Sequence, residues 1–75
     1  MKVHELLDIT DYNQYAVVQR YSNFDSRLGF LSKQTILNEM ANYEVVHMDH
    51  VANFVREKDM YGISVLLRIY VKEND

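Results

Sequence analysis

Hydrophobic and polar residues alternate most regularly near the end of the chain. Over residues 62–72, every second side chain is a branched aliphatic one, and this row consists of Ile63, Val65, Leu67, Ile69 and Val71. A period of two is typical of a strand with one buried face. The pattern predicts a strand over residues 62–72, with this row against a core and Leu66, Arg68 and Tyr70 on the opposite face.

The preceding stretch also favours extended structure. Residues 43–55 read YEVVHMDHVANFV and are rich in β-branched and aromatic residues. The charged, turn-like sequence REKDMYG at 56–62 separates them from the last strand. We therefore predict a strand over about 44–55 that pairs antiparallel with the strand over 62–72.

The first half of the chain predicts a helix followed by a hairpin. Val3, Leu6 and Leu7 share a face at helical spacing, which indicates a short amphipathic helix over residues 2–9. The sequence YAVVQRY at 15–21 predicts a strand, and SNFDS at 22–26 has the composition of a turn. RLGFL at 27–31 predicts a shorter returning strand, in which Gly29 marks a bulge or the strand end.

A second helix is predicted over residues 33–41. Ile36, Leu37 and Met40 fall on one stripe, and Ser32 is placed to accept a hydrogen bond from an amide of the first turn. Asn42 is a candidate left-handed residue that closes this helix, because asparagine tolerates positive φ.

The predicted order α-β-β-α-β-β gives a single α+β domain over residues 1–75. We expect an antiparallel four-stranded sheet with two short helices packed on one face. Residues 72–75, KEND, are expected to fray.

Composition and charge restrict the compartment and the partners. The chain has 75 residues, no cysteine and a net charge of -3 from 11 acidic and 8 basic residues. The absence of cysteine fits a reducing cytoplasm. The early charges exclude a secretory signal, and the longest apolar run, at 63–71, is too short to cross a membrane. The scattered basic residues form no phosphate-binding stripe, so we expect neither direct nucleic-acid binding nor a membrane partner.

The sequence VVHMDHV at 45–51 contains metal-ligand types but in a poor arrangement. Alternation in a strand sends His47 and Asp49 to one face, and Met48 and His50 to the other. The spacing also differs from the i, i+4 histidines of metalloproteases, so we expect no metal. Val46, Met48, His50, Ala52 and Phe54 should line the more covered face, while His47, Asp49 and Asn53 meet solvent. The roles of His47, Asp49 and His50 stay open.

Catalytic signatures are absent from the sequence. The serines lie in turn, cap or strand contexts, and the chain contains no cysteine nucleophile. A phosphate-binding loop needs clustered glycines, but Gly29 and Gly62 are the only two. We therefore predict a protein that is not an enzyme and has no cofactor.

Six tyrosines are the most informative feature of the composition. Aromatic residues are enriched at interfaces, because they supply a large contact area at low entropic cost. The alternative is that several of them only fill the rim of a small core. We predict a partner-binding surface that consists of Leu66, Arg68, Tyr70, Tyr61 and Tyr21.

The opening MKVHELLDITDYNQYAVV resembles a type of small acidic protein common in phages and mobile elements of low-GC Gram-positive bacteria. The similarity includes a leucine-containing helix and an Asp-Tyr-Asn step into a strand, here Asp11, Tyr12 and Asn13. It covers roughly the first 20 residues by sequence and the rest by layout. The resemblance implies an accessory protein that binds and inhibits or redirects a host enzyme, a class that includes anti-CRISPR proteins, and it implies no catalytic residues.

Two function classes follow as expectations. The first is a noncatalytic inhibitor that covers a site on a bacterial host protein. The second is an oligomeric binder of a nucleotide signal, which would need basic and aromatic residues at one pocket, with Arg20, Arg27, Arg56 and Arg68 as candidates. We also expect a homodimer through the last strand, or through the face of Leu66, Arg68 and Tyr70. The alternative is that the first strand covers that edge within the monomer.

Overall fold

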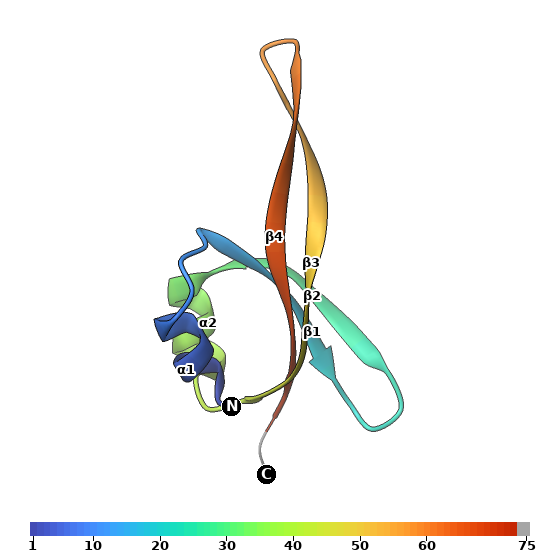
Figure 1. Ribbon diagram of the computed structural model, residues 1–75. Helices are drawn as coiled ribbons and strands as arrows, with labels where there is room; N and C mark the ends of the chain where they lie inside the picture. The colour runs from blue at the N-terminus through green and yellow to red at the C-terminus, as the bar shows by residue number, and fades with distance from the viewer. Residues whose placement is uncertain (74–75) are drawn as a thin grey trace.

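The fold is a four-stranded sheet with both helices on one of its faces, as the computed structural model shows (Figure 1). The structure describes residues 1–73, apart from the side chains of Asn53, Val55 and Glu57. Part of the tail predicted to fray, Asn74 and Asp75, therefore lies outside the described residues. In chain order the elements are α1 (Val3–Asp8), β1 (Gln14–Arg20), β2 (Asp25–Ser32), α2 (Lys33–Met40), β3 (Glu44–Glu57) and β4 (Met60–Lys72).

The predicted α+β class is confirmed, but the predicted antiparallel sheet is wrong. The strand order is β2-β1-β4-β3, and the two central strands β1 and β4 run parallel. The β1–β2 and β3–β4 pairs are antiparallel. After α2, the chain passes to the far edge of the sheet and forms β3, so β4 returns between β3 and β1 in the direction of β1. The alternating pattern of β4 could not reveal this, because a one-sided strand looks the same beside a parallel or an antiparallel neighbour.

A local sequence signal sets the start of α2, whereas contacts from distant residues hold the start of α1. The Ser32 side chain accepts a hydrogen bond from the amide of Thr35 at 3.2 Å, which confirms the predicted cap of α2. The prediction that Asn42 takes a left-handed conformation is wrong, because only Lys58 and Asp59 among the described non-glycine residues have positive φ. The free amides of α1 are satisfied by tertiary contacts instead: Val3 N donates to Tyr43 O at 2.9 Å, and the next amide donates to Ala41 O.

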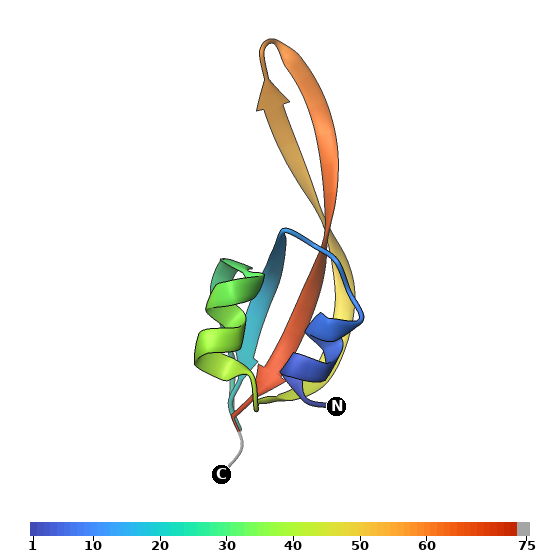
Figure 2. The same cartoon turned by 90° about the vertical axis from the view of Figure 1, so that its left-hand side faces the viewer.

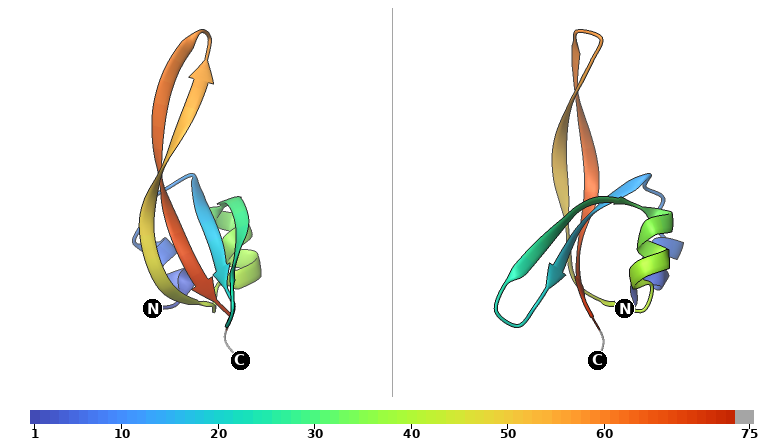
Figure 3. Two further views of the ribbon diagram at one scale, coloured as in Figure 1. Left: turned by 90° about the vertical axis from the view of Figure 1, so that its right-hand side faces the viewer. Right: turned by 180° about the vertical axis from the view of Figure 1, so that it is seen from behind.

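The β1–β2 hairpin contains the predicted bulge. Val17 pairs with Gly29 and Val18 pairs with Arg27, so Leu28 is the extra residue. Gly29 has a φ of +91°, a conformation that glycine adopts at low cost. The hairpin curls away from the helices, so its turn projects to the opposite side of the sheet (Figures 1 and 3).

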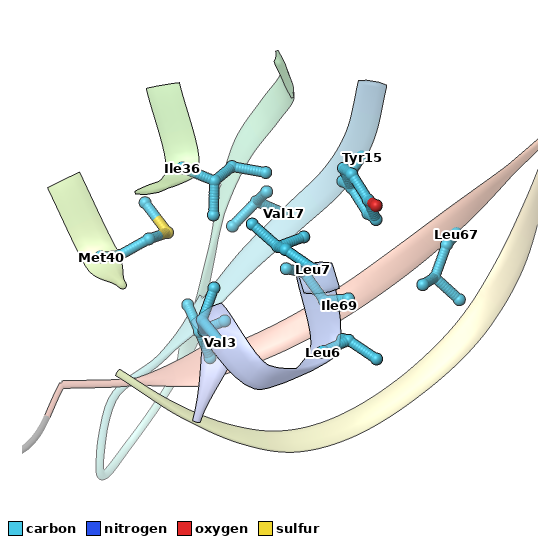
Figure 4. Packing of buried hydrophobic residues seen from close by; sticks show 10 residues of the cluster. Val3, Leu6, Leu7, Tyr15, Val17, Ile36, Met40, Leu67 and Ile69 are labelled. Carbon is cyan, nitrogen blue, oxygen red and sulfur yellow. The ribbon is translucent and has the colours of Figure 1, made fainter. Parts of the chain in front are cut away.

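The core lies between the helices and the inner ends of the two central strands (Figure 4). Tyr15 is fully buried, and its hydroxyl forms a hydrogen bond with the Thr10 hydroxyl at 2.6 Å. This contact satisfies the one polar group that Tyr15 brings into the core. The other members of the cluster are aliphatic or methionine side chains: Val3, Leu6, Leu7, Val17, Ile36, Met40, Leu67, Ile69 and Val71.

The β3–β4 hairpin extends far beyond the rest of the molecule (Figures 1 and 2). Its strands have 14 and 13 residues, and they join at a tight turn in which Lys58 and Asp59 have φ values of 46° and 66°. The predicted break at 56–62 is therefore too long, because these two residues alone make the turn. The predicted buried row of β4 is correct only for Leu67, Ile69 and Val71. Ile63 and Val65 lie beyond the helices and are exposed.

We expect Ile69→Ala to lower the free energy of unfolding by about 2–4 kcal/mol, because the side chain is fully buried and its removal leaves a cavity. Ile9→Ala is the matched control, since Ile9 is 72% exposed and its loss should change stability by no more than about 0.5 kcal/mol. Urea denaturation followed by circular dichroism measures both values. Equal losses in the two variants would contradict the position of the core.

Candidate functional site

The outer half of the β3–β4 hairpin, residues 51–66, is the most exposed apolar part of the molecule, and we call it the hairpin arm. Five of its large apolar side chains are more than half exposed: Phe54 78%, Met60 74%, Tyr61 79%, Ile63 66% and Val65 55%. Soluble monomers rarely expose contiguous apolar patches larger than a few hundred Å². The arm is therefore a candidate contact surface for another macromolecule.

Most of these side chains lie on one face of the arm. In the β3–β4 register, Phe54 pairs with Ile63, Ala52 with Val65 and Arg56 with Tyr61. Directly paired residues and residues two positions apart project to the same side of a hairpin. We call the surface formed by Ala52, Phe54, Tyr61, Ile63 and Val65 the apolar arm face. It continues the face of the sheet that the helices cover nearer the core.

Charged residues are confined to the tip of the arm. The Arg56 guanidinium lies 5.8 Å from the centre of the Tyr61 ring and 3.8 Å from the Asp59 carboxylate. Both of these charged side chains are well exposed, so the ion pair adds little stability. This cation–π contact with Arg56 keeps the Tyr61 ring near the tip of the arm.

A second group of side chains lies on the sheet face opposite the helices, at the base of the arm. Arg68 donates two hydrogen bonds to the two oxygens of Asp49 across the β3–β4 pair, and the Nε contact is 2.7 Å. The Tyr70 ring has the guanidinium of Arg20 at 5.3 Å and that of Arg68 at 5.4 Å, and the His47 ring lies at 5.2 Å. These contacts join β1, β4 and β3 on this face.

The Asp49–Arg68 pair also determines how Asp49 titrates. The hydrogen bond from Arg68 lowers the pKa of the Asp49 carboxyl from its ordinary 3.8, and the positive charge of Arg68 adds to this effect. The same contact raises the pKa of Arg68. Both side chains are about one-third exposed, so the pair lies at the edge of the solvent. It links β3 to β4 there.

A shallow hollow of 210 Å³ lies beside this cluster and is lined mainly by residues of β1 and β2. Phe30, Arg27 and Arg68 line it, over a floor that includes Ala16 and Val18. None of the ion pairs between described residues involves Arg27. The hollow therefore combines an aromatic side chain with a cation that pairs with none of the described carboxylates.

The structure separates the predicted partner-binding residues into three places. Leu66, Arg68 and Tyr70 share the face opposite the helices, as predicted, but each is half-buried. Tyr61 lies on the arm, and Tyr21 stacks on Phe24 at the β1–β2 turn with 4.7 Å between the ring centres. The five residues form no single surface, and their role in binding stays a prediction.

The predicted split of the HxDH sequence is confirmed. Asp49 pairs with Arg68 and His47 with Tyr70 on one face, whereas Met48 pairs with Ile69 on the other. The predicted burial is wrong for Val46, Met48 and His50, which are exposed, and for Asp49, which is half-buried, but His47 is exposed as predicted. Only the start of this edge strand, at Val45, packs against the core among the described side chains of β3. The side chain of Asn53 lies outside the described residues.

The described part of residues 1–73 contains neither a metal-binding cluster nor a membrane-spanning helix. Among the described side chains, no three His, Asp or Glu groups are close enough together to hold a metal ion. Within the same range, no helix is long and apolar enough to cross a membrane.

Comparison with known proteins gave no match: the chain fits no protein-family model, and neither a curated protein nor a solved structure is significantly similar to it. What the protein does must therefore be inferred from its own geometry.

Sequence reasoning misses Phe54, Ile63 and Val65, because alternation alone places them on the covered face of each strand. One signal could have found them. The two predicted strands together are much longer than the helices that were available to cover them. Part of the alternating row had to remain outside the core.

We expect the stability of the protein to depend on Asp49 in acid. Because the folded pKa is lowered, the Asp49–Arg68 pair contributes fully above pH 3.8 and loses its contribution as the pH falls below 3.8 through the lowered value. Asp49→Asn lacks this contribution at every pH. The stability difference between the native protein and the variant should therefore shrink below pH 3.8, as measured by urea denaturation at a series of pH values. A difference that stays constant through this window would contradict the assignment.

Proposed function

We propose that the chain is a noncatalytic accessory protein of a phage or mobile element, which binds a host protein in the bacterial cytoplasm and inhibits or redirects it. The target class that the resemblance implies includes CRISPR and other defence nucleases. Binding of this kind requires no cofactor, no membrane and no direct contact with nucleic acid.

The single observation that carries this proposal is the apolar arm face. Phe54 and Tyr61 are nearly four-fifths exposed on a hairpin whose strands pair up to the turn, and from there they can enter a pocket of another protein. Aromatic anchors of this kind supply much of the binding energy of protein interfaces. The length of the molecule, 47 Å along its longest axis, lets the arm reach into a cleft while the body stays outside.

Such an arm would act by occupying space. A hairpin seated in a substrate channel or at a subunit contact excludes the natural ligand without any chemical step. Imitation of nucleic acid is disfavoured as a mode of inhibition, because a net charge of -3 is small for a protein that must occupy a phosphate-binding channel. We therefore expect the binding to depend more on apolar contact than on ionic strength.

The test is capture of the host protein from a bacterial lysate with the immobilised chain. We expect one stoichiometric partner, and we expect Phe54→Glu to weaken its binding at least about tenfold, because an aromatic hot-spot residue is worth about 2 kcal/mol or more. Calorimetry with the purified partner measures the change.

Ile9→Glu is the matched control. Ile9 is 72% exposed but lies at the end of α1, away from the arm. It should bind like the native protein. If both variants bind normally, or if Ile9→Glu loses as much affinity as Phe54→Glu, the arm is not the contact surface.

A second candidate function is supported by the hollow on the opposite face. Two of the four arginines considered for a nucleotide site, Arg27 and Arg68, line it together with Phe30. Arg56 lies at the tip of the arm and takes no part. A base could stack on the Phe30 ring while Arg27 binds a phosphate, since guanidinium groups match phosphate geometry.

For this second candidate, calorimetry with cyclic dinucleotides and nucleoside monophosphates is the direct measurement. If it is correct, Arg27→Ala should weaken binding about tenfold or more, since a hydrogen bond to a charged group is worth about 1.5–3 kcal/mol. Arg56→Ala serves as the control and should bind normally. Absence of heat with the native protein would remove this candidate.

A further inference from the structure

We propose that a second copy of the chain pairs antiparallel with the free edge of β4 in the hairpin arm, across a two-fold axis at Gly62. This inference does not rest on the proposed host-protein target, because it concerns backbone groups on one edge of the arm rather than its apolar face.

Only the outer part of β4 has a free edge. β1 pairs with β4 from Arg68 to Val71, opposite Ala16 to Gln19, and β3 lies along the other side of β4 throughout. The inner stretch that contains Arg68 and Tyr70 is thus covered on both sides within the monomer. From Met60 to Val65, β4 has a strand on one side only.

The turn shows which backbone groups face this free edge. Glu57 pairs with Met60 around a turn whose two central residues both have positive φ, which is the type I′ geometry. In such a turn the Met60 amide faces the Glu57 carbonyl, and therefore β3. Along an antiparallel pair these directions alternate from one residue to the next. Tyr61, Ile63 and Val65 consequently point their N–H and C=O groups away from β3, where no strand accepts them.

This alternation also restricts how two copies can pair. Outward-facing residues must lie opposite outward-facing residues, so Tyr61 lies opposite the partner's Ile63 when the axis passes through Gly62. An axis further along β4 would bring the partner's turn against the start of β1, because Ala16 already lies beside Arg68.

The chemistry of the edge fits a second copy of the same chain. Residues 60–67, MYGISVLL, contain no charge and no proline, the devices that usually protect an exposed edge. The charges of the arm, Arg56 and Lys58 against Glu57 and Asp59, cancel one another, although the whole chain carries -3. Two arms can therefore meet without net repulsion.

The pairing makes a small interface, which fits a weak dimer. It covers the backbone edge of β4 from Met60 to Val65 and the flanks of the side chains beside that edge, while the apolar arm face itself stays open. Its area is therefore below the roughly 800 Å² per partner of a standard interface, and the backbone hydrogen bonds of the added strand contribute most of its stability. The pairing also turns a two-stranded ribbon, which is marginally stable in water, into a four-stranded sheet.

The symmetry has a consequence for the apolar arm face. The two-fold axis of an antiparallel self-pairing is perpendicular to the sheet, so both copies present the same face to the same side. The two apolar arm faces then join into one surface of twice the area. A partner that binds this face would meet two identical contact sites.

The first test is the mass in solution, measured by light scattering over a range of concentrations. The native protein should rise from 8.9 kDa towards twice that value. Ile63→Pro should remain at 8.9 kDa, because it removes an amide that faces the free edge and spares the β3–β4 bonds. Ile63→Thr is the matched control: it keeps the amide and β-branching, and should still dimerise.

Two results of this experiment would overturn the inference. One is a native protein that stays at 8.9 kDa at the highest concentration. The other is complete loss of the dimer in Ile63→Thr, which would assign the contact to side chains. Phe54 lies on β3, away from the free edge of β4, so Phe54→Glu should lose the host protein and keep the dimer. Failure of this inference is therefore distinguishable from failure of the proposed function.

A cross-linking experiment tests the register, since the chain has no cysteine of its own. Gly62→Cys places two thiols at the axis, and a short bis-maleimide should join them. Ala52→Cys is the control on β3, where the two copies are separated by three strand spacings, about 14 Å or more. Linkage through Ala52→Cys that is as fast as linkage through Gly62→Cys would overturn the edge-to-edge arrangement.

Discussion

The structure depends on a mismatch of length between its helices and its two longest strands. At about 1.5 Å per residue, the 6-residue α1 and the 8-residue α2 span only about 9 and 12 Å. At about 3.3 Å per residue, the 14-residue β3 extends about 46 Å. The helices can therefore cover only the inner end of the β3–β4 hairpin. The core forms where the helices lie over the β3–β4 hairpin, and the uncovered part of the hairpin is the arm.

This mismatch explains both the stability and the exposure of the molecule. Within the overlap, Ile69 and Val17 lie side by side in the parallel pair, and the helices bury them completely. Beyond it, Ile63 and Val65 continue the same row into solvent. Their exposure costs free energy in the isolated chain, because apolar area stays in contact with water. An arm of this kind gains its stability when another surface covers it, which links its shape to a binding role.

The opposite face of the sheet determines how the arm joins the body. Asp49 and Arg68 pair across β3 and β4 just where β1 begins to lie beside β4, and Arg68 and Arg20 both contact the Tyr70 ring. These contacts hold three strands together at the base of the arm. Because the pair is bidentate, it fixes the direction of the Arg68 side chain as well as its charge. The same arginine lines the hollow with Arg27 and Phe30, so one residue serves both features.

Local patterns were sufficient to predict the elements, the cap at Ser32, the bulge at Gly29 and the separation of His47 and Asp49 from Met48 and His50. Each of these depends on neighbouring residues, through the period of a strand, a hydroxyl beside free amides, or a backbone angle that glycine tolerates. The parallel pairing of β4 with β1, and the burial of Leu67 but not Ile63, follow from the assembled fold alone. Both residues belong to one alternating row. The difference between them is their distance from two helices that lie far away in the chain, and no local pattern contains that distance.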